Sequence, residues 1–376
     1  MLLLLVGELF GLHTLRQILD VHGIKSNRWS KVYASISYSD IERSISEMLL
    51  RLTEERLAEV ASKSEATWSR HEVTMVFDDS IFKQWLEDEP IGEHFAKYFS
   101  GQTNCAVYGL RITLCGLCIG DVFYPTHLHL SHKGEDTKAV GRRLLAKLHG
   151  ELYRWSLNYG LDYPNLYLSA DSGFDCPELL GLCDELSKIL PVVPICVPRK
   201  NHLFEKDGFS GSFQQFIEQV YLPAEEKYLE ECREQGKQPE SFLMRIRGRY
   251  ANKDREVTLV IFRLNGSKKV SLIYSTDLNA KSKTLRRRWF QRTLIEQLFR
   301  MLKDTLKIQQ SKVTDHIEFL RKLWVWLFKA LHCQLFRNYC RRNFRLLKGW
   351  AFTRLRQRIT YRGIESEFLE ALVRQG

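Results

Sequence analysis

The sequence lacks the features that mark several large classes of protein. No apolar run approaches the roughly 20 residues that a membrane-spanning helix needs, and the stretch from Leu2 to Val6 is far too short. Internal repeats and low-complexity linkers are absent, and the nine prolines are scattered. A glycine-rich phosphate loop of the nucleotide-hydrolase type is also missing. These absences predict a protein with no membrane partner and a reaction that needs no nucleotide cofactor.

The cysteine pattern argues against a disulfide framework. The nine cysteines are odd in number and mostly embedded in apolar runs, as at Cys115, Cys118, Cys196 and Cys333. This pattern is typical of a protein that folds in a reducing cytosol. Cys115 and Cys118 form a CxxC, but no second CxxC completes a zinc site. We interpret them as core residues, with zinc or redox chemistry as the less favoured alternative.

Three histidines lie close together in the run HLHLSH. His127 and His129 alternate with Leu128 and Leu130, and His132 follows. Alternation of this kind is typical of a half-exposed strand. We therefore interpret the histidines as structural residues, with a metal site as the alternative.

The composition predicts a folded protein whose charge is unevenly distributed. A chain of 376 residues with 44% hydrophobic content can bury the cores of two or three domains. The formal net charge is +11, but residues 281–362 contain 22 Lys and Arg against four Asp and Glu, a balance of +18, so the rest carries −7. Aromatic residues are interleaved with these cations: Trp324, Trp326, Phe328, Phe336, Tyr339, Phe344, Trp350 and Phe352. The region favours binding of a polyanion such as DNA, with a solvated charged face as the alternative.

The hydrophobic pattern changes along the chain and predicts an α/β fold. Residues 1 to about 70 read as helical. The runs VTMVF, CAVYGLRITLCGLCIG and DVFYPTHLHL then read as three strands, the last two joined by a turn at Gly120 and Asp121. A helix over about Thr137 to Tyr159, a strand before Asp171, a helix near Pro177 to Leu190 and the strand VVPICVP complete this part.

Two of these predicted strands lead into carboxylates. Asp78 and Asp79 follow VTMVF, and Asp171 follows NLYLSA. We expect each to lie at the carboxyl end of its strand, where open α/β sheets bind their ligands. Asp78 and Asp79 would point to opposite faces of the strand, so we expect only one of them to face the site.

A third carboxylate lies in the run WFQRTLIEQLFRMLK. On a helix, Trp289, Glu296 and Lys303 fall within about 60° of Arg292, so that cations flank one carboxylate. An apolar stripe borders this row and allows the helix to dock on a core: Ile295, Leu298 and Leu302. Such a row suits joint binding of a metal ion and a phosphate, and an ordinary amphipathic helix with solvated charges is the alternative.

The interval between Asp171 and Glu296 is too long for one strand and a loop. Residues 199–282 contain RIRGRY, VTLVIFRL and VSLIYST, which predict a mainly antiparallel β-subdomain. Three arginines would share one strand face, against a DNA backbone: Arg245, Arg247 and Arg249. The aromatic residues of this interval suit core packing, with stacking on a flipped base as the alternative: Phe213, Phe216 and Tyr221.

Together these motifs resemble the DDE transposases of bacterial insertion sequences, in the IS-four-like family that carries a β-rich insertion. The helical run keeps the family's spacing of Tyr, Arg, Glu and Lys, with Trp289 in place of Tyr. The family's first catalytic Asp directly follows a strand and has a Ser or Thr two residues on, which favours Asp78, with Ser80, over Asp79. The segment around Asp171, with Ala before it and a small residue, Gly and an aromatic after it, is similar to the second catalytic segment. The element order is similar to a ribonuclease-H-like core.

The resemblance implies a metal-dependent enzyme that cuts DNA and joins strands. Asp78, Asp171 and Glu296 would hold two Mg²⁺ ions, or Mn²⁺ as a substitute. Arg292, Lys303 and Trp289 would contact DNA phosphates. The implied partners are double-stranded DNA, as terminal inverted repeats and target DNA, and a second copy of the chain in a synaptic homodimer. A bacterial cytoplasmic protein, associated with the nucleoid when bound to DNA, is expected.

The resemblance also implies the domain boundaries and two rival functions. The predicted parts are a helical N-terminal region that binds DNA ends, the first part of the core, a β-rich insertion, the second part of the core and a basic tail: 1–70, 71–198, 199–282, 283–340 and 341–376. One rival function is a nuclease of the same fold that does not rejoin strands. The other is a decayed transposase that only binds DNA.

Overall fold

The structure is a computed structural model whose contacts divide the chain into two compact units. One unit comprises residues 1–47, 81–111 and 297–376, and the other comprises residues 48–80 and 112–296. The residues described are 38–62, 73–83, 94–100, 104–161, 166–239, 241–263, 269–305 and 323. Most of the basic, aromatic-rich C-terminal region therefore lies outside the described residues, as does most of the predicted N-terminal region except α4 (Tyr38–Ala61).

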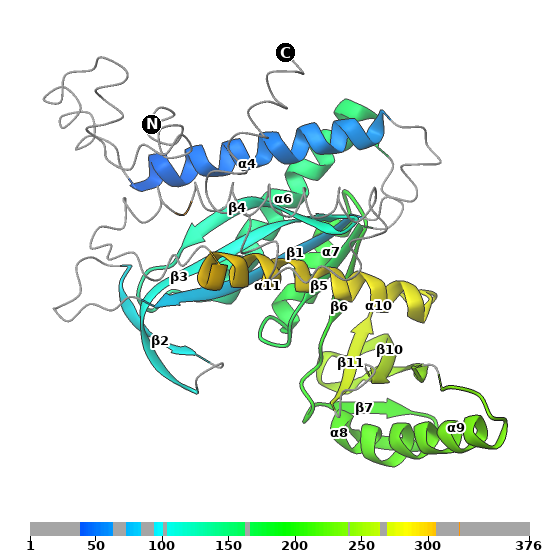
Figure 1. The fold of residues 1–376 in the computed structure, drawn as a ribbon. Helices are drawn as coiled ribbons and strands as arrows, with labels where there is room; N and C mark the ends of the chain where they lie inside the picture. The colour runs from blue at the N-terminus through cyan, green and yellow to red at the C-terminus, as the bar shows by residue number, and fades with distance from the viewer. Residues whose placement is uncertain are drawn as a thin grey trace, which may run out of the picture. The chain divides into compact units, whose positions relative to one another are not determined.

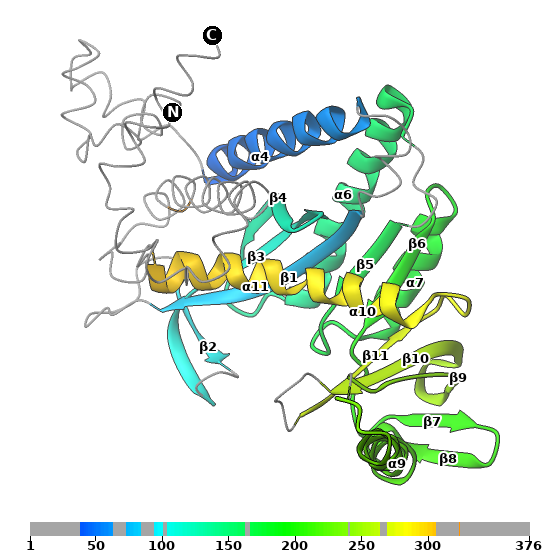
Figure 2. The same cartoon turned by 45° about the vertical axis from the view of Figure 1, so that its right-hand side comes forward.

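The predicted strands of the first half of the chain are present (Figures 1 and 2). They are β1 (Val73–Lys83), β3 (Cys105–Ile119), β4 (Val122–Leu130), β5 (Leu166–Ala170) and β6 (Val192–Cys196). Their order in the sheet is β4, β3, β1, β5, β6. β5 is parallel to both β1 and β6, whereas β3 and β4 form an antiparallel hairpin. Gly120 occupies the hairpin turn with φ 61°, a conformation that glycine adopts at little cost.

The strands of the predicted insertion continue the same sheet, and the last three, which are antiparallel, were predicted from the sequence, whereas the first two were not. They are β7 (Leu203–Lys206), β8 (Phe209–Ser212), β9 (Leu243–Tyr250), β10 (Arg255–Arg263) and β11 (Val270–Ser275). β11 pairs antiparallel with β6 through Tyr274 and Cys196, so the insertion is joined edge to edge to the earlier strands. The chain is thus a mixed α/β protein with a large, mostly antiparallel sheet.

Helices inside this interval were not predicted. α8 (Phe213–Phe216), a π-helical turn η1 (Ile217–Tyr221) and α9 (Leu222–Glu234) follow one another between β8 and β9. Phe213, Phe216 and Tyr221 are all buried there. These rings therefore form part of a core, as the first of the two interpretations held, and not a surface for base stacking.

The helices that follow β4 and β5 lie where the sequence predicts them, and the first of them has a capping residue at each end. α6 spans Thr137–Tyr159, with Asp136 accepting a hydrogen bond from the Lys138 N–H at 2.9 Å and Gly160 closing the helix at φ 60°. α7 spans Pro177–Ser187, three residues shorter than predicted. Among the described residues, no helix is long and apolar enough to cross a membrane.

Helices cover both faces of the sheet at β1. Thr74 faces α10 (Ser282–Gln291), where its hydroxyl bonds the Gln291 side chain. Phe77 faces α6, where a Cβ added to Gly141 would stand 2.6 Å from its ring. Because alternate residues of a strand point to opposite faces, Asp78 belongs to the α10 face and Asp79 to the α6 face.

The unit that includes residues 81–111 and 297–376 contains a strand that was not predicted. β2 (Ala96–Ser100) pairs antiparallel with the start of β3, through partners such as Tyr98 and Val107. In the same unit, the rings of Phe82 and Phe299 meet edge to face at 6.2 Å. The run AKYFS is too short to show a clear period in the sequence.

Candidate active site

Asp78 was predicted to lie at the carboxyl end of its strand. It lies within β1 instead, because the strand continues to Lys83. The parallel register still brings it to the edge where the neighbouring strand ends. Val76 is opposite Ser169, so continuing the register by two residues places Asp78 opposite Asp171. The two predicted carboxylates therefore meet at one position along neighbouring strands, and Asp78 is largely buried.

Asp171 begins a tight turn directly after β5, as predicted. Its carboxylate accepts a hydrogen bond from the Gly173 N–H, and its carbonyl accepts one from the Phe174 N–H at 3.1 Å. A Cβ at Gly173 would stand only 3.3 Å from the Asp171 carboxylate, which favours glycine in this turn. The Asp171 side chain remains 40% exposed and is accessible to a ligand.

The helix that carries Glu296 is interrupted, whereas the sequence predicted one continuous helix from Trp289 to Lys303. α10 ends at Gln291, α11 spans Thr293–Arg300, and a π-helical turn η3 covers Met301–Thr305. The Thr293 hydroxyl donates to the Phe290 carbonyl at 2.7 Å, and so competes for the oxygen that a regular helix would give to a backbone N–H. Arg292 lies at the resulting break.

Arg292 joins all three predicted carboxylates. Its Nη1 lies 3.6 Å from the Asp78 Oδ2 and 3.8 Å from the Asp171 Oδ2, and its Nη2 forms an ion pair with Glu296. Glu296 is four residues further along the chain, so this last contact follows from helical spacing. The contacts with Asp78 and Asp171 depend on the way in which α10 packs across the sheet.

The site holds more negative than positive charge. The pKa of Asp78 is raised to about 7, chiefly by burial and also by the nearby Asp79 and Asp171 carboxylates, while the Arg292 guanidinium opposes the rise. The Asp79 backbone N–H also donates to the Asp78 Oδ1 at 2.9 Å, which lowers the pKa. One guanidinium therefore pairs with three carboxylates.

The raised pKa of Asp78 predicts a pH-dependent cost to stability. The folded protein favours the protonated carboxyl between the ordinary aspartate pKa of 3.8 and the folded-state pKa of about 7, so stability falls as the pH rises through this window. In EDTA, the stability that Asp78→Asn gains over wild type is therefore expected to be larger at pH 8 than at pH 5, by about 2 to 3 kcal/mol. Urea unfolding at both pH values measures this difference, with Asp79→Asn as the control. An Asp78→Asn effect that is the same at pH 5 and pH 8 would contradict the raised pKa.

Trp289 and Lys303, two of the predicted phosphate contacts, both lie against aromatic rings. Trp289 packs edge to face against Phe262, with ring centroids 5.9 Å apart, and the Arg292 guanidinium lies 6.0 Å from its ring. Lys303 belongs to the unit that includes residues 81–111 and 297–376, where its Nζ lies 5.2 Å from the Phe82 ring. The roles of Arg292, Lys303 and Trp289 as phosphate contacts remain predictions.

The histidines and the CxxC belong to the protein interior or to ion pairs. Burial lowers the pKa of His127 to about 4, and His129 pairs with Glu135 at 2.8 Å. Burial raises the pKa of the Cys115 and Cys118 thiols, which keeps them protonated. The seven cysteines in the described part are free. In that part of the chain, no group of three or more His, Cys, Asp or Glu side chains is arranged to hold a metal ion.

Two buried features of this region were missed by sequence reasoning. Gln291 donates to the Gly120 carbonyl at 2.9 Å and so ties α10 to the β3–β4 hairpin. Asp175, four residues after Asp171, forms a buried ion pair with Lys253. The sequence marks Asp175 only as a polar residue between Phe174 and Cys176, which does not identify its partner, and Gln291 has no such signal.

Comparisons with known proteins give a distant likeness. No protein-family model matches the chain, and no curated protein matches it. Among solved structures, it is similar to piggyBac transposase, in a cryo-EM structure of the synaptic complex with hairpin DNA. The TM-score is 0.39 and the identity 9%, over 70% of this chain and 47% of that chain. The chain therefore spans about half the length of that transposase.

Proposed function

We propose that the chain is a metal-dependent DNA transposase of the DDE type. One observation carries the proposal: the three carboxylates selected from the sequence, Asp78, Asp171 and Glu296, converge on the guanidinium of Arg292. They come from two neighbouring strands and a helix that are far apart in the sequence. If the helix were an ordinary amphipathic helix with solvated charges, its carboxylate would not be expected to lie beside Asp78 and Asp171.

The element order supports the same proposal. Apart from the short β2, three strands, β1, β3 and β4, precede α6, β5, α7 and β6, an order similar to the ribonuclease-H-like core that the sequence resembles. The pairing of β5 with β1 sets Asp171 level with Asp78. In this proposal the helix bearing Glu296 completes the core after the β-rich insertion of the IS-four-like family.

The donor set suits Mg²⁺. Oxygen ligands from a few carboxylates are what this ion prefers, and Mn²⁺ accepts the same ligands. Asp78, Asp171 and Glu296 would hold two ions, which would stabilise the attacking and leaving oxygens of a phosphodiester. The guanidinium of Arg292 now lies where the three carboxylates meet, so it competes with a bound cation for them.

The other residues would bind and orient the DNA. Arg292, once released from the carboxylates, and Lys303 would hold phosphates near the scissile bond, and Trp289 would support Arg292 through its ring. No protein nucleophile is needed, because the attacking group is water in the first step and the freed 3′-hydroxyl of the DNA end in the second. A synaptic homodimer would bring the two ends together.

The experiment that tests the proposal is Mg²⁺-dependent cleavage of a DNA fragment that carries the sequences flanking the gene on both sides. Wild type is compared with Asp171→Ala. Cleavage at the ends that the variant loses would support the proposal, and strand-transfer products would separate a transposase from a nuclease of the same fold. Tight DNA binding without cleavage in either Mg²⁺ or Mn²⁺ would favour a decayed transposase that only binds DNA.

The exposed face of β9 provides a prediction about DNA binding with an internal control. Arg245, Arg247 and Arg249 alternate on this face, as predicted. Arg249 pairs with the carboxylates of Glu205 and Asp254, at 3.1 and 2.6 Å. In contrast, Arg245 donates to the Leu278 carbonyl and Arg247 to the Asn279 side chain, which are neutral groups.

Within the described part of the chain, Arg245 and Arg247 have no carboxylate partner, so their charges are not compensated and can attract a phosphate. Arg247→Gln is expected to weaken binding of double-stranded DNA and to reduce the slope of log K against log salt by about 1. Arg249→Gln should leave that slope nearly unchanged, because its charge is already compensated. Titrations of a fluorescent duplex at several salt concentrations measure both slopes. Equal losses for the two variants would count against this assignment.

A further inference from the structure

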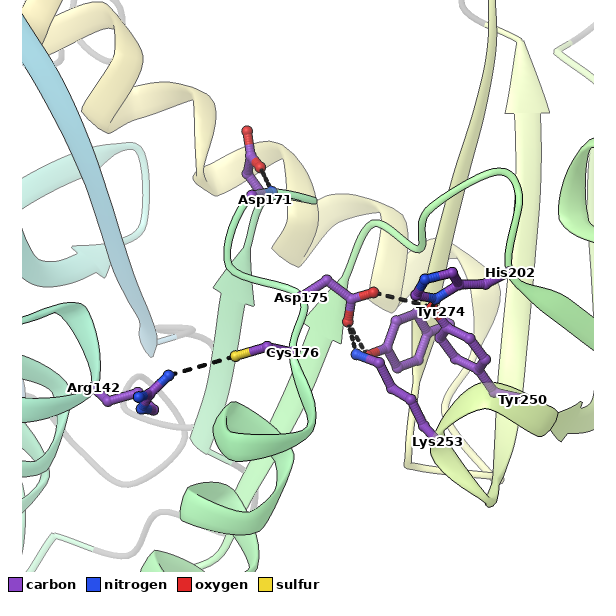
Figure 3. Close-up of polar contacts among 9 residues, drawn as sticks. Arg142, Asp171, Asp175, Cys176, His202, Tyr250, Lys253 and Tyr274 are labelled. Carbon is purple, nitrogen blue, oxygen red and sulfur yellow. Dashed lines mark hydrogen bonds and ion pairs between the residues drawn. The ribbon is translucent and has the colours of Figure 1, made fainter. Parts of the chain in front are cut away.

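A buried polar cluster joins the β-rich segment to the turn that carries Asp171 (Figure 3). Asp175 accepts hydrogen bonds from the hydroxyls of Tyr250, at 3.2 Å, and Tyr274, at 2.5 Å, and it forms an ion pair with Lys253. The side chains of Asp175 and Lys253 are 0% and 2% exposed. Both carboxylate oxygens of Asp175 are therefore held by groups from the β-rich segment.

The hairpin between β9 and β10 delivers two members of this cluster. Tyr250 is the last residue of β9, and Lys253 ends the short 3₁₀ turn η2 (Ala251–Lys253). Asp254 follows in the left-handed conformation, with φ 48°, and returns the chain to β10. His202 also contacts the cluster, because its Nδ1 lies 2.5 Å from the Tyr250 hydroxyl.

The turn after β5 is fixed by other contacts as well. Phe174 packs edge to face against Phe77 of β1, with ring centroids 4.5 Å apart. Arg142 of α6 donates to the Cys176 sulfur at 3.6 Å. Asp175 is held by the β-rich segment, so every residue from Phe174 to Cys176 has a contact that fixes the turn. The Asp171 carboxylate at the start of this turn is 40% exposed.

A buried ion pair is a costly way to gain stability alone. The loss of water around two charges offsets much of their attraction, and apolar residues of similar volume often serve as well. What the pair adds is a defined geometry, because Asp175 must meet one ammonium and two hydroxyls at the same time. The cluster therefore specifies where the turn lies more strongly than an apolar contact would.

We propose that Asp175 is a positioning residue for the reaction centre: through Lys253, Tyr250 and Tyr274, the β-rich segment holds the turn that presents Asp171. The role of Asp171 in this inference rests on the proposed function. The β-rich segment is in this case more than a surface for DNA, because part of it sets the position of a site carboxylate.

Hydrogen exchange of the full-length protein, followed by mass spectrometry, tests the positioning directly. Tyr274→Phe keeps the ring and removes the hydroxyl that contacts both Asp175 and Lys253. The peptide containing Gly173 and Phe174 is expected to exchange at least about threefold faster in this variant, and faster still in Lys253→Met. Peptides from β1 and α6 should be unchanged.

Tyr221→Phe is the matched control. It removes another buried hydroxyl from the same β-rich segment, one that donates to Glu225 at 3.1 Å and does not contact Asp175. It should leave exchange of the Gly173 peptide unaltered. If Tyr274→Phe does not speed exchange of that peptide, or if Tyr221→Phe speeds it equally, the positioning role is overturned. Should Lys253→Met fail to fold, Tyr274→Phe alone decides.

A second readout separates positioning from a general loss of stability. At a temperature where all variants are folded, the Mn²⁺ concentration that gives half-maximal DNA cleavage is expected to rise about tenfold in Tyr274→Phe and to stay unchanged in Tyr221→Phe. Wild type that cleaves, with an unchanged Mn²⁺ requirement in Tyr274→Phe, would overturn the proposal. Wild type that does not cleave would overturn the proposed function instead, and hydrogen exchange would then decide the positioning by itself.

Discussion

Replacing Glu296 with Gln is expected to abolish metal-dependent cleavage of DNA, by at least about a thousandfold, without loss of the fold. The amide is nearly isosteric with the carboxylate but is a poorer ligand for Mg²⁺. The Glu296 side chain is 40% exposed, and the buried guanidinium of Arg292 keeps Asp78 and Asp171 as partners after the change. Cleavage rates with Mg²⁺, together with circular dichroism and DNA affinity, measure the outcome.

Glu185→Gln is the control for this change. Glu185 is also an exposed helical carboxylate with a cation three residues along, Lys188, but it lies on α7. It should retain full cleavage activity. Substantial cleavage by Glu296→Gln would remove Glu296 from the mechanism, and the same measurement on Asp78→Asn and Asp79→Asn tests the choice between those neighbours.

Removing the side chain of Arg292 is expected to have the second large effect. Without divalent ions, Arg292→Ala leaves three carboxylates close together with no guanidinium between them, and Asp78 is largely buried. The variant should be less stable than wild type at pH 8 by about 2 to 3 kcal/mol, somewhat below the cost of breaking a fully buried pair. Thermal unfolding in EDTA measures the loss.

Divalent ions should reverse this loss. Because the guanidinium no longer competes for the carboxylates, Mn²⁺ is expected to raise the melting temperature of Arg292→Ala more than that of wild type. The variant should also bind DNA more weakly and with a flatter salt dependence, if Arg292 contacts a phosphate. Arg249→Ala is the control, since Arg249 pairs with two carboxylates at the surface. An equal response of wild type and Arg292→Ala to Mn²⁺ would contradict competition at the site.

Local patterns in the sequence predicted many of the elements. α6 was predicted with both ends correct, because Asp136 and Gly160 are strong capping residues at the borders of an amphipathic run. The three antiparallel strands β9, β10 and β11 were predicted from their β-branched runs and turns. The helices α8 and α9 were missed, and the break at Arg292 was missed because a threonine hydroxyl, and not a glycine or proline, competes with the helix backbone.

The sequence by itself determined the positions of most strands, but not of β2, β7 and β8, and it determined the identity of the candidate carboxylates, since these features follow from residues close together in the chain. Only the tertiary structure decided that Asp78 lies level with Asp171, that Arg292 reaches both, and that Lys253 is buried against Asp175. These contacts depend on strand register and on the packing of α10 across the sheet. Such choices are made by burial between distant segments, and no local period in the sequence encodes them.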